Sequence, residues 1–384
     1  MSQTILSLDF YGNEMIAALA SFDEKTATLR LRQIFRQPCR AFSGALVRDM
    51  DTARTELARL LSKLNQFSLS NPSVIVGLRG PFLSYKHSRG FQSVASRSRV
   101  VSNRDIDAAI RDSVPTSLSE MLEVVDILPQ SYVIDGNEGI VNPLGMTGCM
   151  LEAETFLSCA LNTHLQTLHT LLKDCGCEDY QELPSVVALG ETLLKPEEKI
   201  NGTILVDLGT THTSAILYQQ GSLVDAWELT MGQDTLVEMV ADLMQNDLPT
   251  VRRLLEEYTP GSDEVMDDLL EDAQIKLLEK LKKELLQSSL PYLKHPAANL
   301  ILCGTMTDKP FQKLVKKIFN VRRVRIGNAD YLRTDCADDS PAAAGAVSLL
   351  YHFLEREQVQ SGIQQPKEKG LISGFLNKFN QLFE

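Results

Sequence analysis

The chain carries the same strand-and-turn plan twice, and this repetition constrains its fold more than any single motif does. In the first half, the apolar run Ile5–Asp9 (ILSLD) leads into a turn that contains Gly12. In the second half, Thr203–Asp207 (TILVD) leads into a turn that begins at Gly209. Another apolar run follows each turn, which is the pattern of a β-hairpin. The repetition therefore predicts a duplicated α/β protein.

The segments after each hairpin extend the parallel between the two halves. Helical spacing of apolar residues separates the predicted helices from the predicted strands. The first half continues with a strand, a helix and a buried strand, at 28–34, 51–64 and 74–78. The second half continues with a strand, two helices and a buried strand, at 223–229, 232–244, 263–287 and 299–303.

The stretch 84–165 follows a different pattern and interrupts the first half. A capping box formed by Ser102 and Asp105 predicts a helix that starts at about residue 103. Two separate strands are predicted on either side of Pro129-Gln130, and a further strand follows from Met150. This mixture predicts a small inserted α+β subdomain.

Composition excludes several other classes of protein. A chain of 384 residues is long enough for two to three domains at roughly 150 residues each. The formal net charge of −12 argues against nucleic acid as a partner, and the basic group between Lys313 and Arg325 is interpreted as a solvated or subunit-contact face. The seven cysteines are dispersed, which predicts free thiols and no cysteine-based metal site. Neither a signal peptide nor a transmembrane helix is expected.

Two acidic residues occupy corresponding positions in the two halves. Asp9 ends the first strand and Asp207 ends its counterpart, and each precedes a turn that contains glycine. In a duplicated α/β protein, such turns can face each other across a cleft. Their backbone N–H groups would hold phosphates, and the two Asp residues would hold a hydrated Mg²⁺. A third turn at Gly304 and Thr305 would approach an adenosine. The alternative is that the Asp residues only end strands at turns, as Asp often does.

The end of the chain carries one continuous apolar stripe at helical spacing, after a polar linker. The favoured interpretation is a helix that lies on a membrane surface, and a helix that packs on the body or on a partner remains the alternative. One such helix would be a weak, reversible anchor, so firm attachment would need several copies held together. The stripe comprises Leu371, Ile372, Phe375, Leu376, Phe379, Leu382 and Phe383.

Several stretches resemble the FtsA family, the actin-like cell-division proteins of bacteria. The most specific is ILPQSYVIDGNEGIVNPLGMTGCMLEAETFLSC at 127–159. Further similarity lies in VDLGTTHTSAILY (206–218), NLILCGT (299–305), RVRIG (323–327) and the Ala-rich helix at 341–354. The likeness runs along nearly the whole chain, and the terminal linker and helix stand where that family carries its membrane anchor.

The resemblance implies an actin-like two-lobed fold with ATP and Mg²⁺ in the central cleft. It also implies head-to-tail self-association and recruitment of later division proteins. The family's role is to bind the C-terminal tail of the tubulin-like protein FtsZ. It thereby tethers FtsZ filaments to membrane phospholipid on the cytoplasmic face of the cell membrane, at the division site.

The resemblance also assigns segments and residues. Lobe 1 is expected at 1–83, 166–200 and the closing helix 341–356, with the inserted subdomain at 84–165. Lobe 2 is expected at 201–244 and 299–340, with a shortened outer subdomain at 245–298. A linker at 357–369 and the membrane helix at 370–384 follow. The expected metal ligands are Asp9 and Asp207. The expected nucleotide-binding residues are Asp9, Gly12, Asn13, Asp207, Gly209, Thr210, Thr211, Gly232, Gly304 and Thr305.

The phosphate turns depart from the family pattern. Thr210 and Thr211 stand where glycines are usual, and Tyr11 takes a usual glycine place in the first turn. Side chains at such positions hinder close approach of a phosphate to the backbone. We therefore expect weak or altered ATP binding and little hydrolysis.

Two other classes of protein remain open as alternatives. A PilM-type scaffold of a pilus platform would share the cleft and the insert, but no free amphipathic tail is expected there. An active enzyme of the same superfold, such as a sugar kinase, would need an intact glycine-rich turn and a catalytic carboxylate beside it. The fold alone does not decide between these functions.

Overall fold

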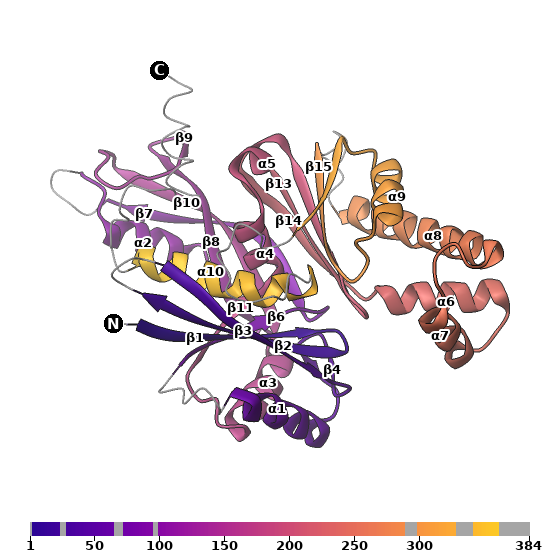
Figure 1. Cartoon of the computed structure of the whole chain (residues 1–384). Coiled ribbons are helices and arrows are strands. Elements are labelled where there is room, and N and C mark those ends of the chain that lie inside the picture. The colour runs from indigo at the N-terminus through magenta and orange to yellow at the C-terminus, as the bar shows by residue number, and fades with distance from the viewer. Residues whose placement is uncertain are drawn as a thin grey trace.

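The computed structural model describes residues 2–23, 28–64, 72–94, 99–288, 298–327 and 341–360. The chain folds into two similar lobes, with an additional subdomain inserted into the first lobe (Figure 1). This is the duplicated, two-lobed α/β fold that the repeated strand-and-turn plan predicts.

The sheet of the first lobe has the strand order β11-β6-β1-β2-β3. β1 pairs antiparallel with β2 and parallel with β6. A short hairpin of two further strands, β4 (Phe42–Ser43) and β5 (Leu46–Val47), follows β3. The sheet strands are β1 (Ser2–Tyr11), β2 (Glu14–Asp23), β3 (Thr28–Pro38), β6 (Ser73–Leu78) and β11 (Tyr180–Pro184).

The sheet of the second lobe repeats this topology strand for strand. Its order is β16-β15-β12-β13-β14, with β12 antiparallel to β13 and parallel to β15. Asp9 on β1 lies opposite Gly77 on β6, and Asp207 on β12 lies opposite Cys303 on β15. The two Asp residues therefore hold equivalent places in the two sheets. The strands are β12 (Thr203–Leu208), β13 (Thr213–Gln219), β14 (Ser222–Leu229), β15 (Asn299–Gly304) and β16 (Arg323–Ile326).

Helices cover both faces of the first sheet. α1 (Met50–Leu64) and α3 (Asn162–Asp174) pack on the face to which β1 presents Leu6, Leu8 and Phe10. On the opposite face, β1 contributes Ile5 and Tyr11 to a core that includes α10. The helices on the side that faces the second lobe are α4 (Ser185–Leu193) and α10 (Ala344–Gln360). The short helix η2 (Pro341–Ala343) precedes α10, and α5 (Pro196–Asn201) packs on strands of the second lobe.

The outer part of the second lobe is helical. α6 (Gln233–Met244), α7 (Leu248–Glu257), α8 (Glu264–Ser288) and α9 (Lys309–Phe319) enclose the second core. The sequence prediction did not include α7. Its start carries a recognisable signal, because Asp247 accepts a hydrogen bond from the Thr250 backbone N–H and a proline follows in the first turn.

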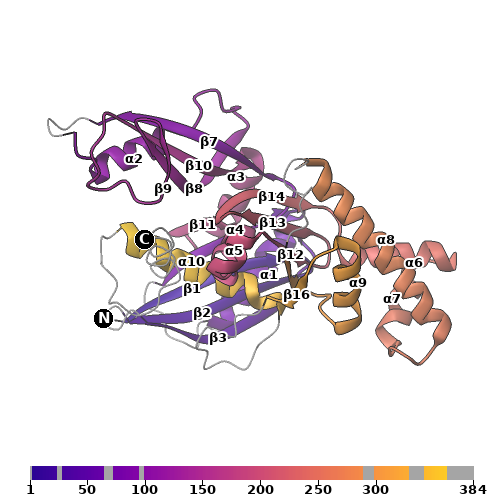
Figure 2. The same ribbon diagram turned by 90° about the horizontal axis from the view of Figure 1, so that it is seen from above.

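The inserted subdomain is a four-stranded sheet in the order β7-β10-β8-β9, covered by α2. Figure 2 displays it on the side of the molecule opposite to α6–α8. The prediction of two strands around Pro129 is wrong, because β8 runs through as one strand with a register shift next to Pro129. A bulge lets a strand continue past a residue that cannot donate a hydrogen bond. The elements are β7 (Leu83–Ser93), α2 (Asn103–Asp112), β8 (Leu122–Ile134), β9 (Asn137–Ile140) and β10 (Met150–Leu161).

The predicted membrane helix at 370–384 lies outside the described residues, as does most of the predicted linker at 357–369. α10 continues to Gln360, so it extends beyond the predicted end of the closing helix at 356. Within the described part of the chain, no helix is both long and apolar enough to cross a membrane.

Candidate site between the lobes

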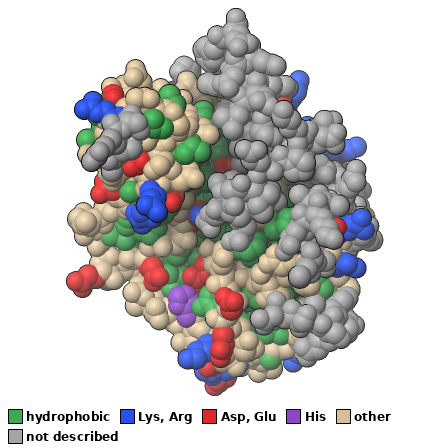
Figure 3. Space-filling model, turned by 90° about the vertical axis from the view of Figure 1, so that its left-hand side faces the viewer, with side chains coloured by type: hydrophobic (Ala, Val, Ile, Leu, Met, Phe, Trp, Pro, Cys, Tyr) green, Lys and Arg blue, Asp and Glu red, His purple; other side chains and the backbone are tan. Residues whose placement is uncertain are grey.

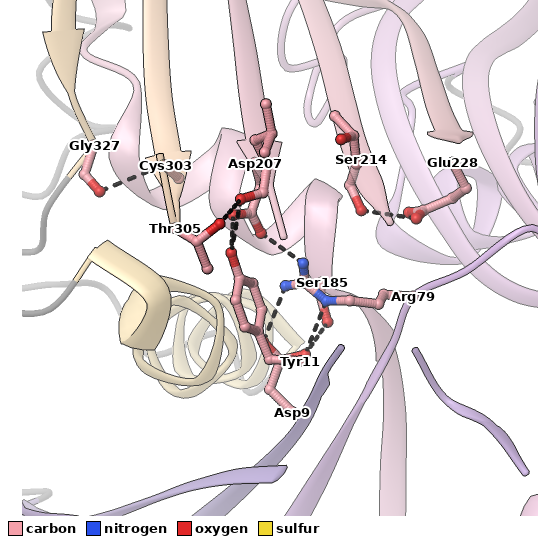
Figure 4. A network of polar contacts seen from close by, with 12 residues as sticks. Asp9, Tyr11, Arg79, Ser185, Asp207, Ser214, Glu228, Cys303, Thr305 and Gly327 are labelled. Atoms are coloured by element: carbon pink, nitrogen blue, oxygen red, sulfur yellow. Dashed lines mark hydrogen bonds and ion pairs between the residues drawn. The ribbon is translucent and has the colours of Figure 1, made fainter. Parts of the chain in front are cut away.

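Asp9 and Asp207 lie close together, and an arginine joins them (Figure 4). Neither ends its strand as predicted, because β1 continues to Tyr11 and β12 to Leu208. The Nη1 atom of Arg79 lies 2.6 Å from Oδ2 of Asp207, and its Nη2 atom lies 3.0 Å from Oδ2 of Asp9. The Arg79 Nε atom adds a contact of 3.3 Å to Oδ1 of Asp9. All three side chains are at most 3% exposed. Arg79 therefore forms a buried ionic bridge from the first lobe to the second.

The alternation of the strands explains why these side chains converge. Side chains two residues apart on a strand point to the same face, so Asp9 and Tyr11 share the face of β1 that looks toward the second lobe. Ile75 and Gly77 share the corresponding face of β6, and Arg79 continues that alternation just beyond the strand. On β12, the side chains that pack on the outer helices alternate with Asp207. Both carboxylates thus face the boundary between the lobes.

Hydroxyl groups complete the ionic bridge. The Tyr11 hydroxyl donates to Oδ1 of Asp207 at 3.2 Å and lies 3.3 Å from the Leu208 carbonyl oxygen. The Ser185 hydroxyl donates to Oδ1 of Asp9 at 2.9 Å. The Arg79 guanidinium also lies 4.8 Å from the centre of the Tyr11 ring. Each of the four carboxylate oxygens therefore has a donor within the protein.

Burial and the neighbouring charges shift the pKa values of the residues in this cluster. Burial tends to lower the pKa of Arg79, but the charges of Asp9 and Asp207 outweigh burial and raise that pKa well above its usual value. The guanidinium therefore stays charged. Burial raises the pKa of Asp207, against the opposing effect of Arg79. Burial and the charge of Asp207 raise the pKa of Tyr11 well above its usual value, so its hydroxyl stays a donor.

The two predicted phosphate turns touch each other. Gly12 has a φ of +64°, and a Cβ atom added there would lie 2.1 Å from Oγ1 of Thr210. The Thr210 hydroxyl donates to the Asn13 side-chain oxygen at 3.3 Å. The Thr211 hydroxyl is paired with the neighbouring ring of His212 at 2.7 Å. The structure thus brings the residues of the two predicted turns together. Their polar side chains form hydrogen bonds within the protein.

Backbone donors in the second predicted phosphate turn and at the start of the following helix already have acceptors. The Gly209 N–H donates to the His212 carbonyl oxygen at 2.9 Å. At the start of α6, which Gly232 precedes, the N–H groups of Gln233 and Asp234 donate to the carbonyl oxygens of Gly209 and Thr210. These helix-terminal N–H groups are the usual place for an anion, and here the turn itself occupies them.

The predicted adenosine turn also forms its hydrogen bonds within the protein, to the end of β12. The Thr305 N–H and hydroxyl both reach the Leu208 carbonyl oxygen, at 2.9 and 3.1 Å. A Cβ atom added at Gly304 would lie 2.1 Å from that oxygen and 2.7 Å from the Tyr11 hydroxyl oxygen. The Tyr11 side chain therefore packs against the predicted adenosine turn. The resemblance to FtsA implies a glycine at the position of Tyr11.

A second polar cluster lies beside the ionic bridge. Glu228 on β14 accepts hydrogen bonds from the Ser214 hydroxyl at 2.7 Å, the Gly80 N–H at 3.0 Å and the Tyr85 hydroxyl at 3.0 Å. Gly80 and Tyr85 belong to the first lobe and its insert, so this cluster also crosses the boundary. Burial raises the pKa of Glu228 to about 7, against the opposing effects of the Ser214 hydrogen bond and the Arg79 charge.

His212 makes another contact between the lobes. Its Nε2 atom lies 3.3 Å from the Ser43 hydroxyl oxygen, on the hairpin of the first lobe. Burial and the positive charges of Arg79 and Arg48 lower the pKa of His212 to about 4, so the ring is neutral near pH 7. A neutral ring at this place adds no positive charge for a phosphate.

The arrangement between the lobes does not fit the expected Mg²⁺ and ATP. The space between Asp9 and Asp207 holds the Arg79 guanidinium, whose positive charge would repel a metal ion placed beside it. Among the described residues, no group of three or more His, Cys, Asp or Glu side chains is placed to hold a metal ion. The two expected metal ligands are therefore engaged with Arg79.

Sequence reasoning missed Arg79, although a signal was present. Arg79 directly follows a fully apolar strand and precedes Gly80-Pro81, an unusual place for a charged side chain. The strand pairs in parallel with β1, so its end meets the same sheet edge as Asp9. The sequence prediction covered residues 74–78 as a plain buried strand and stopped one residue short of Arg79.

The basic group at 313–325 lies away from this site. Except for Lys317, its residues line a cavity of about 790 Å³ between α5, β15, α9 and β16. Arg325 in this cavity pairs with Glu198 at 2.7 Å, so part of the positive charge is balanced internally. The face of the molecule drawn in Figure 3 carries acidic and basic side chains interspersed on the described surface.

Comparison with known proteins identifies the relationship. Residues 83–158 match the model of the SHS2 domain inserted in FtsA. The chain is 22% identical over 351 residues to the cell division protein FtsA of Streptococcus pneumoniae, a match that covers 85% of this chain and 75% of that protein. The chain is thus similar to FtsA along most of its length. It is also 26% identical over 256 residues to FtsA of Pseudomonas aeruginosa, covering 66% of this chain but only 58% of that FtsA.

Solved structures place this chain in the actin-like fold. The PilM–PilN complex of type IV pilus biogenesis superposes with a TM-score of 0.65 at 13% identity, covering 92% of this chain and 98% of the solved chain. MreB5 of Spiroplasma citri, solved bound to ADP, superposes with a TM-score of 0.51 at 11% identity, covering 94% and 99%. These similarities establish the actin-like fold that the sequence comparison predicts.

Proposed function

We propose that this protein is an actin-like adaptor of bacterial cell division. In this role it tethers FtsZ filaments to the cytoplasmic face of the cell membrane at the division site. It binds the C-terminal tail of FtsZ, attaches to phospholipid through the helix at 370–384, and associates head to tail with further copies. The assembled copies recruit later division proteins.

The observation that carries this proposal is the insert. An actin-like fold by itself supports many functions. The four-stranded insert matches the subdomain inserted in FtsA, and it interrupts the first lobe between β6 and β11. Similarity to FtsA also extends over most of the chain outside the insert. The division role is therefore the function that the fold and the sequence support best together.

Membrane attachment rests on the apolar stripe of the last helix. A large apolar side chain contributes roughly 1.5–3 kcal/mol when fully buried, and burial at a membrane surface is only partial. The net charge of −12 opposes binding to an anionic membrane, so the apolar stripe has to supply the attraction. Self-association strengthens such an anchor because linked copies bind together.

Nucleotide is not part of the proposed role. MreB5 is bound to ADP in its solved structure, but its likeness to this chain supports the fold alone. In this chain the residues expected to hold Mg²⁺, Asp9 and Asp207, are paired with Arg79.

A PilM-like scaffold is the second candidate. The superposition on the PilM–PilN complex, which covers nearly the whole of both chains, shows that the fold is compatible with such a scaffold. The amphipathic stripe at 371–383 separates the two candidates, because a scaffold of that type is not expected to carry a free membrane helix.

Sedimentation with liposomes tests the proposed anchor. The full chain is expected to sediment with liposomes, and a chain that lacks residues 371–384 is expected to stay in the supernatant. Two matched variants add the same charge to opposite faces of the helix. Phe379→Asp is expected to abolish sedimentation, because it places a charge in the apolar stripe. Asn377→Asp, on the polar face, is expected to retain it. Equal sedimentation of the full and shortened chains would contradict the anchor.

A further inference from the structure

We propose that Arg79 takes the place of a bound cation and locks the two lobes together, so that the protein keeps its closed conformation without nucleotide or metal. The inference concerns the cleft and does not depend on the proposed division role. It rests on the contacts of Arg79, on the room made for it, and on the packing of the surrounding turns.

The protein itself supplies a counter-charge in the cleft, one arginine shared by two carboxylates. Two carboxylates that face each other across a cleft need a counter-charge, because burying like charges together is costly. Arg79 supplies one from the first lobe and contacts both, at 3.0 Å to Asp9 and 2.6 Å to Asp207. With Tyr11 and Ser185 as further donors, the carboxylates are fully hydrogen-bonded. A metal ion would have to displace the guanidinium before it could reach them.

The surrounding backbone makes room for the guanidinium. A Cβ atom at Gly345, in the first turn of α10, would lie 2.2 Å from Oδ2 of Asp9 and 2.8 Å from Nη2 of Arg79. A Cβ atom at Gly77 would lie 2.5 Å from the Ser185 hydroxyl oxygen and 3.0 Å from Oδ1 of Asp9. Two glycines from different elements thus allow α10 and β6 to close around the ionic bridge. The bridge is a packed part of the fold.

The predicted phosphate and adenosine turns are in contact with one another. Gly12 packs against Thr210, and Gly304 packs against the Tyr11 hydroxyl, so the three turns touch through side chains and backbone. Binding of a phosphate between them would require the turns to separate. Separation would break the contact of Arg79 with Asp207.

Other hydrogen bonds across the boundary also join the two lobes. The Gly80 N–H reaches Glu228, and the Ser43 hydroxyl pairs with His212. These contacts come from the segment directly after Arg79 and from the hairpin of β4 and β5. Together with the ionic bridge they join the lobes at three separate places, and none of the three uses a ligand.

Nucleotide titration of the unmodified full-length protein tests the inference directly. Isothermal titration with Mg²⁺·ATP, Mg²⁺·ADP and Mg²⁺ alone is expected to give no saturable heat at millimolar ligand. The melting temperature is expected to be unchanged, because only a ligand that binds the folded state raises it. MreB5 of Spiroplasma citri serves as the positive control for ADP. Saturable binding that Asp207→Asn abolishes would overturn the inference.

Hydrogen exchange tests the locking role of Arg79. The Gly80 amide reports on the boundary because its acceptor lies in the other lobe. Arg79→Gln is expected to speed its exchange at least tenfold, while amides of β12 inside the second sheet stay protected. Arg79→Lys keeps the charge but cannot bridge both carboxylates with the same geometry, so an intermediate rate is expected. Unchanged exchange at Gly80 in Arg79→Gln would overturn the role. If Arg79→Gln does not fold, the titration of the unmodified protein still decides.

Discussion

At the scale of single residues, the boundary between the lobes depends on buried charges that are paired across it. Arg79 joins Asp9 to Asp207, and Glu228 gathers three donors from both sides. Removing one member of a buried ion pair is more destabilising than replacing both members by apolar side chains, because the remaining charge stays buried without a partner. Single substitutions here are therefore expected to have larger effects than substitutions of exposed ion pairs.

Glu228 gives the protein a pH-dependent stability. Its pKa is raised by burial to about 7 in the folded state, from 4.5. A carboxyl with a raised pKa favours the folded state most at low pH, and this contribution is lost as pH rises toward and through 7. Glu228→Gln cannot ionise and has nearly the same shape. Relative to the unmodified protein, it is therefore expected to gain up to about 3 kcal/mol in free energy of unfolding between pH 5 and pH 8.

Urea denaturation of both proteins at several pH values measures this difference. The groups that face Glu228 are the Tyr85 hydroxyl, the Ser214 hydroxyl and the Arg79 guanidinium, and only the carboxyl changes charge in this range. A difference between the two proteins that stays constant from pH 5 to pH 8 would show that Glu228 does not titrate in the folded state.

The residue scale also marks the limit of sequence reasoning. Asp9 and Asp207 were found because they repeat at equivalent places in two similar segments. Arg79 has no counterpart in the second half, where Thr305 follows β15. Repetition cannot reveal a residue that is not repeated. The partner of the two carboxylates became visible only once the lobes were placed against each other.

At the scale of elements, close packing of a helix on a strand depends on one glycine of the insert. A Cβ atom at Gly90 on β7 would lie 2.0 Å from the Ala109 carbonyl oxygen and 2.3 Å from the Ser113 amide nitrogen. Both are backbone atoms of the α2 region, so no side chain can move aside. Gly90→Ala is expected to push α2 away and lower the free energy of unfolding by about 1–3 kcal/mol.

Chemical denaturation, with hydrogen exchange to locate the change, checks this expectation. Exchange is expected to rise in α2 and in the part of β7 that it covers. Ser84→Ala, on the same strand and exposed, serves as the control and is expected to leave stability nearly unchanged. An unchanged free energy of unfolding in Gly90→Ala would mean that α2 tolerates the shift.

Elements differed in how well the sequence predicted them. Long segments with clear periodicity, such as α1 and α8, were predicted with their type and approximate bounds. The strand across Pro129 was split, because a proline in a sheet is tolerated only where the ladder is irregular, and such a bulge depends on the partner strand β10. α7 was missed, although Asp247 caps its start.

At the scale of the whole molecule, the duplication determines the architecture. Two sheets of the same strand order face each other across α4 and α10, with the insert on one side and the outer helices on the other. This much followed from the repeated plan and the FtsA-like stretches. Whether the cleft is open or closed did not, because lobe closure depends on contacts between residues that are far apart in the sequence.

In the proposed role, the two closed lobes lie at the membrane surface and tether FtsZ to it. Because the Arg79 bridge would hold the lobes together without nucleotide, the protein would tether FtsZ irrespective of the ATP supply. The body is acidic, so the apolar tail rather than electrostatic attraction has to hold it on the lipid.

Recruitment of FtsZ filaments to liposomes tests the central claim most directly. Purified FtsZ, liposomes and the full chain are mixed without ATP, and the FtsZ in the sedimented fraction is measured. The proposed role predicts that FtsZ sediments with the liposomes when the full chain is present. It predicts that FtsZ stays in the supernatant when the chain lacks residues 371–384. If the full chain sediments while FtsZ remains in the supernatant, the protein is not an FtsZ tether.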